Sequence, residues 1–386
     1  MPKRKICVVI GSRANYNSIK SAMRAIQARG DLELQVVVGA SALLDRYGSV
    51  VELVERDGFQ PSAKVYMLIE GETPLTMAKS TGLGLLELPT VFEQLKPDIV
   101  LTVGDRFETM ATTLAAAYMN IPLVHTMGGE ISGTIDESIR HAVTKFAHLH
   151  FPACSQAAER IIKMGERPED VHLVGCPRID LVAEIDRQGT DGLSDTLFEE
   201  GVGARFDLRK PFLIVSQHPV TTEYGDGERQ ITETLMAVHR LKLPAIVLWP
   251  NADAGSEHVA RGIRKFREHH DHEVQFHFFK NLPFETFIKL MVQARCIVGN
   301  SSAAIREGAF IGIPAVNVGT RQQGRQRGAN VVDVDYHQTA IADAIAQQTK
   351  NGRFPSNPIY GDGRAGERIA QILATCTIRL QKQIAY

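Results

Sequence analysis

Short runs of apolar, often β-branched residues alternate with longer amphipathic segments along the whole chain. A buried parallel strand reads as a continuous apolar run, whereas a helix shows a 3.6-residue period. The alternation therefore predicts parallel sheets covered by helices on both faces. In the first half we expect strands at residues 6–10, 34–38, 99–103, 123–125 and 172–174, and helices near 18–28, 87–94, 108–118 and 135–148.

The pattern restarts at Pro211, and a polar, glycine-containing stretch at 179–210 is expected to link two domains. Each domain is predicted to be a doubly wound, Rossmann-like α/β unit, with a ligand cleft between them. We expect an N-terminal domain at 1–180, completed by a closing helix at 365–386, and a C-terminal domain at 205–364. The second set of expected strands is 212–216, 245–249, 274–279, 296–298 and 315–318.

The stretch 297–325 reads as strand, tight turn, helix, strand and turn. Ser301 and Ser302 supply capping hydroxyls at the start of the helix expected at 303–310. Free N–H groups and the helix dipole make such a start a phosphate site, and Glu307 could accept hydrogen bonds from a ribose diol. Arg321 and Arg325 follow the next strand and could meet phosphate charge. An ordinary βαβ unit with a capped helix remains the alternative.

Acidic residues follow the expected strands of the first domain. Asp105 comes after strand 99–103 and a glycine, and Glu130 follows two glycines after strand 123–125. Because parallel strands end at the same edge of a sheet, these carboxylates are expected to face the cleft. Asp136 and Glu137 open the next helix, where acids also favour the helix dipole. A helix-start salt bridge for Asp105, and a solvated loop acid for Glu130, are the alternatives.

Basic groups occupy corresponding places. Arg13 lies in the turn after the first strand, and Arg106 stands beside Asp105. Both could meet phosphate charge. His218 precedes a proline at the end of strand 212–216, where its ring could protonate or bridge a leaving phosphate oxygen. A structural histidine is the alternative there.

The bulk composition is that of an ordinary globular enzyme: 386 residues, 44% hydrophobic, 23% charged and a net charge of −1. This balance favours neither nucleic acid nor a membrane surface as a partner. Five widely spaced cysteines without a Cys-x-x-Cys pair predict a cytoplasmic protein with reduced thiols, and no signal peptide is recognised. The tract 269–272 has three histidines but no further ligands at zinc spacing, so we expect no metal.

Taken together, the motifs resemble the UDP-N-acetylglucosamine 2-epimerase family, and more narrowly its hydrolysing, N-acetylmannosamine-forming branch. The resemblance runs from about residue 5 to 335. The first motif departs from the branch's usual Gly-Thr-Arg-Ala-Asp-Tyr at two places, and at the second of them Asn15 replaces an acid. The motifs that carry the resemblance are Gly-Ser-Arg-Ala-Asn-Tyr at 11–16, Gly-Asp-Arg-Phe-Glu at 104–108, the run 128–141 from Gly128 to His141, His-Pro-Val-Thr-Thr at 218–222, and Gly-Asn-Ser-Ser at 299–302 with Gly-Thr-Arg-Gln at 319–322.

This resemblance implies a GT-B-like pair of Rossmann domains, with UDP held mainly by the second. It implies catalytic roles for Asp105, Glu130, Asp136 or Glu137, and His218. It implies no cofactor, and we expect a homodimer or homotetramer. The UDP contacts it implies are Arg13, Asn17, Arg106, His218, Asn251, Ser301, Ser302, Glu307 and Arg321.

The implied reaction eliminates UDP from a UDP-sugar to give a glycal, which is then hydrated to the 2-epimer. The C2 proton is not acidic, so one carboxylate must stabilise the developing positive charge while another removes that proton. Four alternatives stay open: the same chemistry on UDP-2,4-diacetamido-2,4,6-trideoxyglucose, a non-hydrolysing epimerase, a GT-B glycosyltransferase, and a nucleotide-sugar sensor without catalysis. Three acids clustered in the first domain disfavour the glycosyltransferase.

Overall fold

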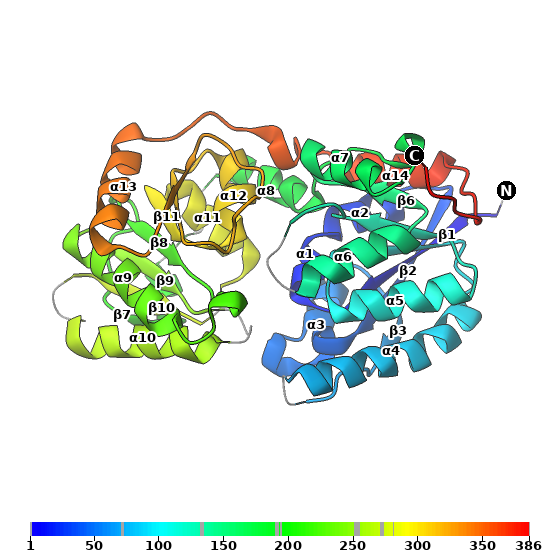
Figure 1. The fold of residues 1–386 in the computed structure, drawn as a ribbon, viewed down its shortest axis with the longest axis horizontal. Helices are drawn as coiled ribbons and strands as arrows, with labels where there is room; N and C mark the ends of the chain where they lie inside the picture. Colours follow the sequence, from blue (N-terminus) through cyan, green and yellow to red (C-terminus); the bar gives the residue numbers. More distant parts are fainter. Residues whose placement is uncertain are drawn as a thin grey trace. The chain divides into compact units, whose positions relative to one another are not determined.

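The computed structural model describes residues 2–70, 73–131, 135–189, 193, 195–250, 255–270, 274–280 and 282–385. The chain forms two compact units (Figure 1). Unit 1 consists of Met1–Ile131, Ile135–Leu181 and Gly361–Tyr386, and unit 2 contains Val182–Tyr360. None of the helices in the described ranges is both long and apolar enough to cross a membrane.

Unit 1 is built on a six-stranded parallel sheet in the order β3-β2-β1-β4-β5-β6. This is the doubly wound order in which the chain reverses direction across the sheet between β1 and β4. The strands are β1 (Arg4–Ile10), β2 (Leu32–Gly39), β3 (Pro61–Val65), β4 (Ile99–Val103), β5 (Leu123–Thr126) and β6 (Leu149–Phe151). The helices are α1 (Arg13–Asn17), α2 (Lys20–Gln27), α3 (Val50–Arg56), α4 (Pro74–Leu95), α5 (Phe107–Tyr118), α6 (Ile135–Phe146), α7 (Ser155–Lys163) and α14 (Ala365–Thr375), with short 3-10 turns η1 (Ala40–Leu43), η2 (Asp45–Tyr47) and η3 (Pro168–Asp170).

Alternation along β1 shows how both faces of this sheet are covered. Ile6, Val8 and Ile10 belong to one buried cluster, whereas Cys7 and Val9 belong to a second cluster on the other face. Successive side chains of a strand point to opposite faces, so a strand that is apolar throughout needs a layer of helices on each side. The first cluster includes residues of α2 and α14, and the second includes residues of α4 and α5.

Unit 2 repeats this arrangement on a seven-stranded sheet in the order β13-β12-β11-β8-β9-β10-β7. All its strand pairs are parallel except the edge pair of β7 with β10. The strands are β7 (Val202–Gly203), β8 (Leu213–Ser216), β9 (Ala245–Leu248), β10 (Phe276–Phe279), β11 (Cys296–Gly299), β12 (Ala315–Val318) and β13 (Val331–Val334). The helices are α9 (Gly227–Arg240), α10 (Ser256–His270), α11 (Phe284–Gln293), α12 (Ser302–Ile311) and α13 (Gln338–Asn351), with turns η4 (Asp195–Glu199), η5 (Thr221–Glu223) and η6 (Pro358–Tyr360); α8 (Pro177–Gln188) crosses the division between the units in the sequence.

The predicted α/β class with two Rossmann-like units is confirmed, but several predicted elements are wrong. Residues 172–174 form no strand. The sixth strand of the sheet is instead β6, and near the predicted position only Val171 forms an isolated bridge, to His150. The closing helix ends at Thr375 instead of continuing to 386. The expected linker at 179–210 contains most of α8. Strands β3 and β13 were missed because neither is a buried apolar run: exposed positions alternate in β3, and the two central residues of β13 are exposed.

Asp180, at the start of α8, caps α14 across 185 residues of sequence. Its carboxylate accepts hydrogen bonds from the backbone N–H groups of Ala365 (2.9 Å) and Gly366 (2.7 Å) and from the Ser21 hydroxyl (2.8 Å). Burial is the largest influence on this carboxyl and raises its pKa despite the three donors. The side chain therefore joins α2, α8 and α14 within unit 1.

We predict that Asp180→Ala lowers the free energy of unfolding by roughly 2 kcal/mol, because it removes a helix cap and leaves buried donors unsatisfied. Urea titration followed by circular dichroism measures the change. Asp362→Ala is the matched control, since Asp362 pairs with Arg368 at the surface. Equal unfolding midpoints for the Asp180 variant and the parent would show that the cap contributes nothing.

Candidate functional site

Arg140 joins two of the predicted catalytic acids in unit 1. Its guanidinium forms an ion pair with the Asp105 carboxylate and donates a 2.7 Å hydrogen bond to the carbonyl oxygen of Glu130. Arg140 is only 5% exposed, so its charge needs these partners. The loop after β4 and the loop after β5 are thereby held by one side chain from α6.

The glycines before Glu130 allow its loop to pack closely. Gly129 has a φ of +74°, and a Cβ there would lie 2.2 Å from the carbonyl oxygen of Ala157 on α7. Arg160, also on α7, donates a 3.0 Å hydrogen bond to the carbonyl oxygen of Gly129. Two arginines from successive helices thus bind two consecutive carbonyl groups, which defines the direction in which the buried Glu130 leaves the backbone.

Asp136 and Glu137 both lie in the first turn of α6. Asp136 stands four residues before Arg140 and so shares its helix face. Glu137 instead lies 3.4 Å from the Nε2 atom of His141, one turn further on. Asp136 and Glu137, which the sequence offered as equal candidates for one catalytic role, therefore point to different faces of α6.

His125 is a fully buried residue of β5 at the same edge of the sheet. Its Nε2 atom lies 2.8 Å from the carbonyl oxygen of Gly104, and its Nδ1 atom lies 3.3 Å from the Thr144 hydroxyl. Burial lowers the pKa of the imidazole to about 3, despite the favourable contact with the Gly104 carbonyl. His125 is therefore neutral at physiological pH.

The predicted phosphate-binding arginines of unit 1 lie on separate loops. Arg13 begins α1 and donates a 3.4 Å hydrogen bond to the carbonyl oxygen of Gly48. Arg106 directly precedes α5, and its Nε–H donates to the buried Glu108 carboxylate at 3.2 Å. Asn17 ends α1. The structure brings Asp105 and Glu130 together through Arg140, whereas Arg13 is bound to the segment before α3.

Asn15, where the sequence departs from the usual acid, is buried between two loops of unit 1. Its side-chain oxygen accepts from the Gly11 N–H (3.3 Å) and the Ser12 hydroxyl (3.1 Å), and its amide N–H donates to the carbonyl oxygen of Val103 (3.3 Å). A carboxylate could not make this last bond, because an ionised acid only accepts. Asn15 thus links the end of β1 to the end of β4.

The start of α12 in unit 2 has the predicted form. Ser301 is the N-cap residue, and its hydroxyl accepts a 3.3 Å hydrogen bond from the N–H of Ala303. Gly299 has a φ of +123°, and a Cβ there would lie 2.2 Å from the carbonyl oxygen of Ser216. Ser302 is the first helical residue, and Glu307 is buried further along the same helix. This helix start presents the anion-binding geometry expected from the sequence.

Asn300 connects three loops beside that helix start. Its side-chain oxygen accepts from the His218 N–H (2.7 Å), and its amide N–H donates to the His218 carbonyl oxygen (2.9 Å). Its own carbonyl oxygen accepts from Arg321 (3.3 Å) and Gln322 (2.8 Å). The predicted residues His218 and Arg321 are therefore brought together by Asn300, which the sequence analysis placed in the motif at 299–302 without a role of its own.

The His218 imidazole has a pKa lowered to about 3, first by burial and then by the positive charge of Arg321. A neutral imidazole can still donate one hydrogen bond to a phosphate oxygen. The remaining predicted UDP contact, Asn251, lies outside the described residues.

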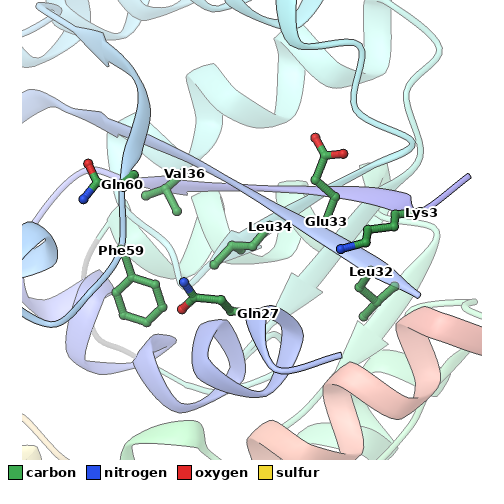
Figure 2. A pocket seen from close by; sticks show the side chains of 8 residues that line it. All are labelled: Lys3, Gln27, Leu32, Glu33, Leu34, Val36, Phe59 and Gln60. Atoms are coloured by element: carbon green, nitrogen blue, oxygen red, sulfur yellow. The ribbon is translucent and has the colours of Figure 1, made fainter. Parts of the chain in front are cut away.

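One pocket of unit 1 lies away from these groups. Figure 2 shows this pocket, which has a volume of about 250 Å³. Its lining residues come from the amino ends of β1–β3 and from α2, whereas the predicted site residues follow the carboxyl ends of the strands. It is lined by Lys3, Gln27, Leu32, Glu33, Leu34, Val36, Phe59 and Gln60.

Sequence reasoning missed Arg140, Arg160, His125 and Asn300 as parts of the site. Arg140 stood within the motif at 128–141, but nothing in its spacing shows that it reaches Asp105, 35 residues earlier. Asn300 follows a strand-ending glycine, which was the available signal for it. Within the described ranges, no three His, Cys, Asp or Glu side chains gather in a way that could hold a metal ion.

Comparison with known proteins identifies the family of this chain. A sequence model described as UDP-N-acetylglucosamine 2-epimerase matches residues 24–374. The chain belongs to the UDP-N-acetylglucosamine 2-epimerase family. As a member of this family it is an epimerase acting on nucleotide sugars, and the family predicted from the motifs is confirmed.

Full-length relatives of this epimerase are known. It is 33% identical to the UDP-N,N'-diacetylbacillosamine 2-epimerase (hydrolyzing) of Legionella pneumophila, with 98% of this chain and 97% of the relative covered. It is 31% identical to a UDP-N-acetylglucosamine 2-epimerase of Neisseria meningitidis, with 96% and 95% covered. The solved epimerase of Methanocaldococcus jannaschii, in complex with UDP-GlcNAc and UDP, matches with a TM-score of 0.77 at 17% identity and coverage of 96% and 99%. That likeness supports the fold.

The neutral His125 predicts a specific pH dependence of stability. The unfolded histidine has a pKa near 6.5 and the folded one about 3, so unfolding takes up a proton between these values. The contribution of His125 to stability is therefore complete above pH 6.5 and decreases as pH falls, by about 2 kcal/mol at pH 5. We expect the stability difference between the parent and His125→Gln to shrink by that amount from pH 7 to pH 5 in urea titrations. A difference independent of pH would contradict the neutral assignment.

Proposed function

We propose that this epimerase is of the hydrolysing type and converts UDP-N-acetylglucosamine and water to N-acetylmannosamine and UDP. The observation that carries the proposal is the pairing of Asp105 and Glu130 through the buried Arg140. It holds two acidic residues at one edge of unit 1, Asp105 through its carboxylate and Glu130 through its backbone carbonyl. Elimination and hydration at adjacent ring carbons require more than one acid. The Legionella pneumophila relative, whose name includes the hydrolysing activity, supports the same type of reaction.

In the proposed first step, the bond between C1 and the UDP oxygen breaks and its electron pair leaves with UDP. A carboxylate takes the C2 proton, and the product is a glycal. In the second step, a proton returns to C2 from the opposite face, the oxygen of a water molecule bonds to C1, and a carboxylate takes the remaining proton. One water is consumed overall. Negative charge beside the ring stabilises the cationic character at C1 in both steps.

We assign the acid roles to Asp105, Glu130 and Asp136, and not to Glu137. Asp136 shares a helix face with Arg140, whereas Glu137 lies beside His141. The pair formed with Arg140 leaves Asp105 21% exposed at its side chain, so the carboxylate is anchored and still accessible. A carboxylate anchored in this way needs little reorganisation when charge develops on the sugar.

We assign UDP binding mainly to unit 2. The N–H groups at the start of α12, with Ser301 and Ser302, suit the diphosphate, and Arg321 and His218 lie together beside Asn300. Glu307 is proposed to accept hydrogen bonds from the ribose. The remaining proposed contacts with UDP are made by Arg13, Asn17, Arg106 and Asn251.

A second substrate has support of its own. The Legionella pneumophila relative is named for UDP-N,N'-diacetylbacillosamine, and a Campylobacter jejuni relative that is 30% identical carries a GDP/UDP-N,N'-diacetylbacillosamine name. The same acids would act on a 2,4-diacetamido-2,4,6-trideoxy sugar, because the reaction involves only C1 and C2. The two substrates differ at C4 and C6, so only the pocket around those carbons distinguishes them.

We predict that Asp105→Asn, Glu130→Gln and Asp136→Asn each lower kcat by roughly 100-fold or more while changing the affinity for UDP less than about threefold. Each substitution keeps the shape and removes a charge that acts as the ring becomes cationic. Glu137→Gln is the matched control and should keep most of the activity. Steady-state kinetics and calorimetry with UDP measure both effects. If a variant keeps kcat within about threefold of the parent value, the substituted residue does not have the proposed catalytic role.

We predict that a reaction in 18O-labelled water releases a free manno sugar and unlabelled UDP, because the bond that breaks joins carbon to oxygen. In D2O the product should carry deuterium at C2. Mass spectrometry at short reaction times, with UDP-N-acetylglucosamine and its diacetamido-trideoxy analogue run in parallel, also identifies the substrate. An intact UDP–manno sugar in equilibrium with the substrate would reject the hydrolysing type. Turnover of the analogue alone would keep the mechanism and replace the substrate.

A further inference from the structure

A closed ring of contacts surrounds the backbone that carries Asp105. It runs from the Gly104 carbonyl oxygen to His125 Nε2 (2.8 Å), and from His125 Nδ1 to the Thr144 hydroxyl (3.3 Å). Thr144 then donates to the Arg140 carbonyl oxygen at 3.0 Å, and the Arg140 guanidinium returns to the Asp105 carboxylate. The two ends of the ring are adjacent residues in the chain. Both the backbone before Asp105 and its carboxylate are therefore held by one connected set of groups.

The contacts of His125 define its protonation state. A carbonyl oxygen only accepts, so Nε2 must carry the proton that is donated to Gly104. In the neutral ring Nδ1 then carries no proton and lies 3.3 Å from the Thr144 hydroxyl oxygen, whose own proton is donated to the Arg140 carbonyl. His125 is fully buried. Its influence on a reaction must therefore pass through the Gly104 carbonyl.

The surrounding glycines leave room for this ring. A Cβ on Gly128 would lie 2.8 Å from His125 Nδ1 and 3.0 Å from the Thr144 hydroxyl oxygen, closer than real contacts allow. Gly104 has a φ of +75°, in the left-handed region that side chains disfavour. The N–H of Gly104 donates to the Thr126 carbonyl oxygen (3.2 Å), and its carbonyl oxygen accepts from the His125 N–H, so both backbone groups of this turn are paired.

We propose that His125 is a positioning residue of the epimerase: its Nε2–H tautomer fixes the turn at Gly104 and thereby aims the Asp105 carboxylate. This inference rests on the proposed role of Asp105. It extends that role to a residue that touches neither substrate nor reacting atoms. The Gly104 carbonyl selects this tautomer because it only accepts, and Thr144 and Arg140 complete the ring.

The test compares two substitutions of the same residue. His125→Leu removes both ring nitrogens, and we expect kcat to fall roughly 10- to 100-fold while the affinity for UDP changes less than about twofold. His125→Gln keeps an N–H group that can reach the Gly104 carbonyl, and should recover most of the lost kcat. His148→Leu is the matched control, because His148 bonds the N–H of Leu123 at the opposite end of β5. A kcat within about threefold of the parent for His125→Leu, or an equal loss for His148→Leu, would overturn the proposal.

A double substitution separates positioning from general loss of structure. In an Asp105→Asn background there is no carboxylate to aim, so adding His125→Leu should lower kcat by less than about twofold. A loss equal to the product of the two single losses would overturn the proposal, since independent residues behave additively in free energy.

Nuclear magnetic resonance of the parent enzyme gives a readout that needs neither folding of a variant nor the proposed reaction. Two-bond correlations between ring protons and 15N should show His125 with its proton on Nε2 at neutral pH. Finding Nδ1–H in the parent would overturn the ring. Absence of hydrolysing turnover in the parent would reject the proposed function, while the tautomer would still test the contacts of His125.

Discussion

The rest of each unit depends on how its loops are held where the strand order reverses. At this point two neighbouring parallel strands, β1 and β4 in unit 1 and β8 and β11 in unit 2, continue into loops that turn to opposite sides of the sheet. Backbone groups at these strand ends lose the partners that a continuing sheet would provide, and buried groups of this kind must be satisfied in another way. Unit 1 uses Asn15, which connects the turn after β1 to the carbonyl oxygen of Val103. Unit 2 uses Asn300, which bonds both backbone groups of His218. An amide serves both places because it donates and accepts at once. These hydrogen bonds of Asn15 and Asn300 fix the loops that carry candidate site residues.

The buried positive charge of Arg140 is the second constraint on the loops of unit 1. A buried guanidinium is costly unless it is paired, and Arg140 finds one ionic and one carbonyl partner on two different loops. The same contact that compensates its charge brings two acids to one edge of the sheet. Glu130 gains further definition from Arg160 through the neighbouring carbonyl of Gly129. The acids of this epimerase are thus oriented by arginines that do not themselves belong to the sequence-predicted catalytic set.

Local sequence was sufficient for the elements whose pattern is strong. The mostly apolar strands β1, β4, β11 and β12 and the capped start of α12 were predicted to within a few residues, because burial on both faces favours an apolar run and a helix start favours a capping hydroxyl. The edge strands β3, β6 and β13 were harder to predict from the sequence. In β3 exposed residues alternate with half-buried ones, and in β13 the two central residues are exposed, so neither strand shows a continuous apolar buried run. In β6 only three residues are paired, and they directly follow a helix whose pattern continues into them.

What the sequence determined by itself was the α/β class, the family and the residue types that an elimination at a nucleotide sugar requires, since these depend on periodicity and on short motifs. What only the tertiary structure decided was which side chains act on one another. Arg140 reaches Asp105 across 35 positions, Asn300 reaches His218 across 82, and Asp180 caps a helix 185 residues away. It also separated Asp136 from Glu137, which are adjacent in the chain: Asp136 shares a helix face with Arg140, whereas Glu137 lies beside His141. Contacts of this kind depend on the order of strands in a sheet and on the packing of helices over it, and neither is encoded within a local stretch of chain.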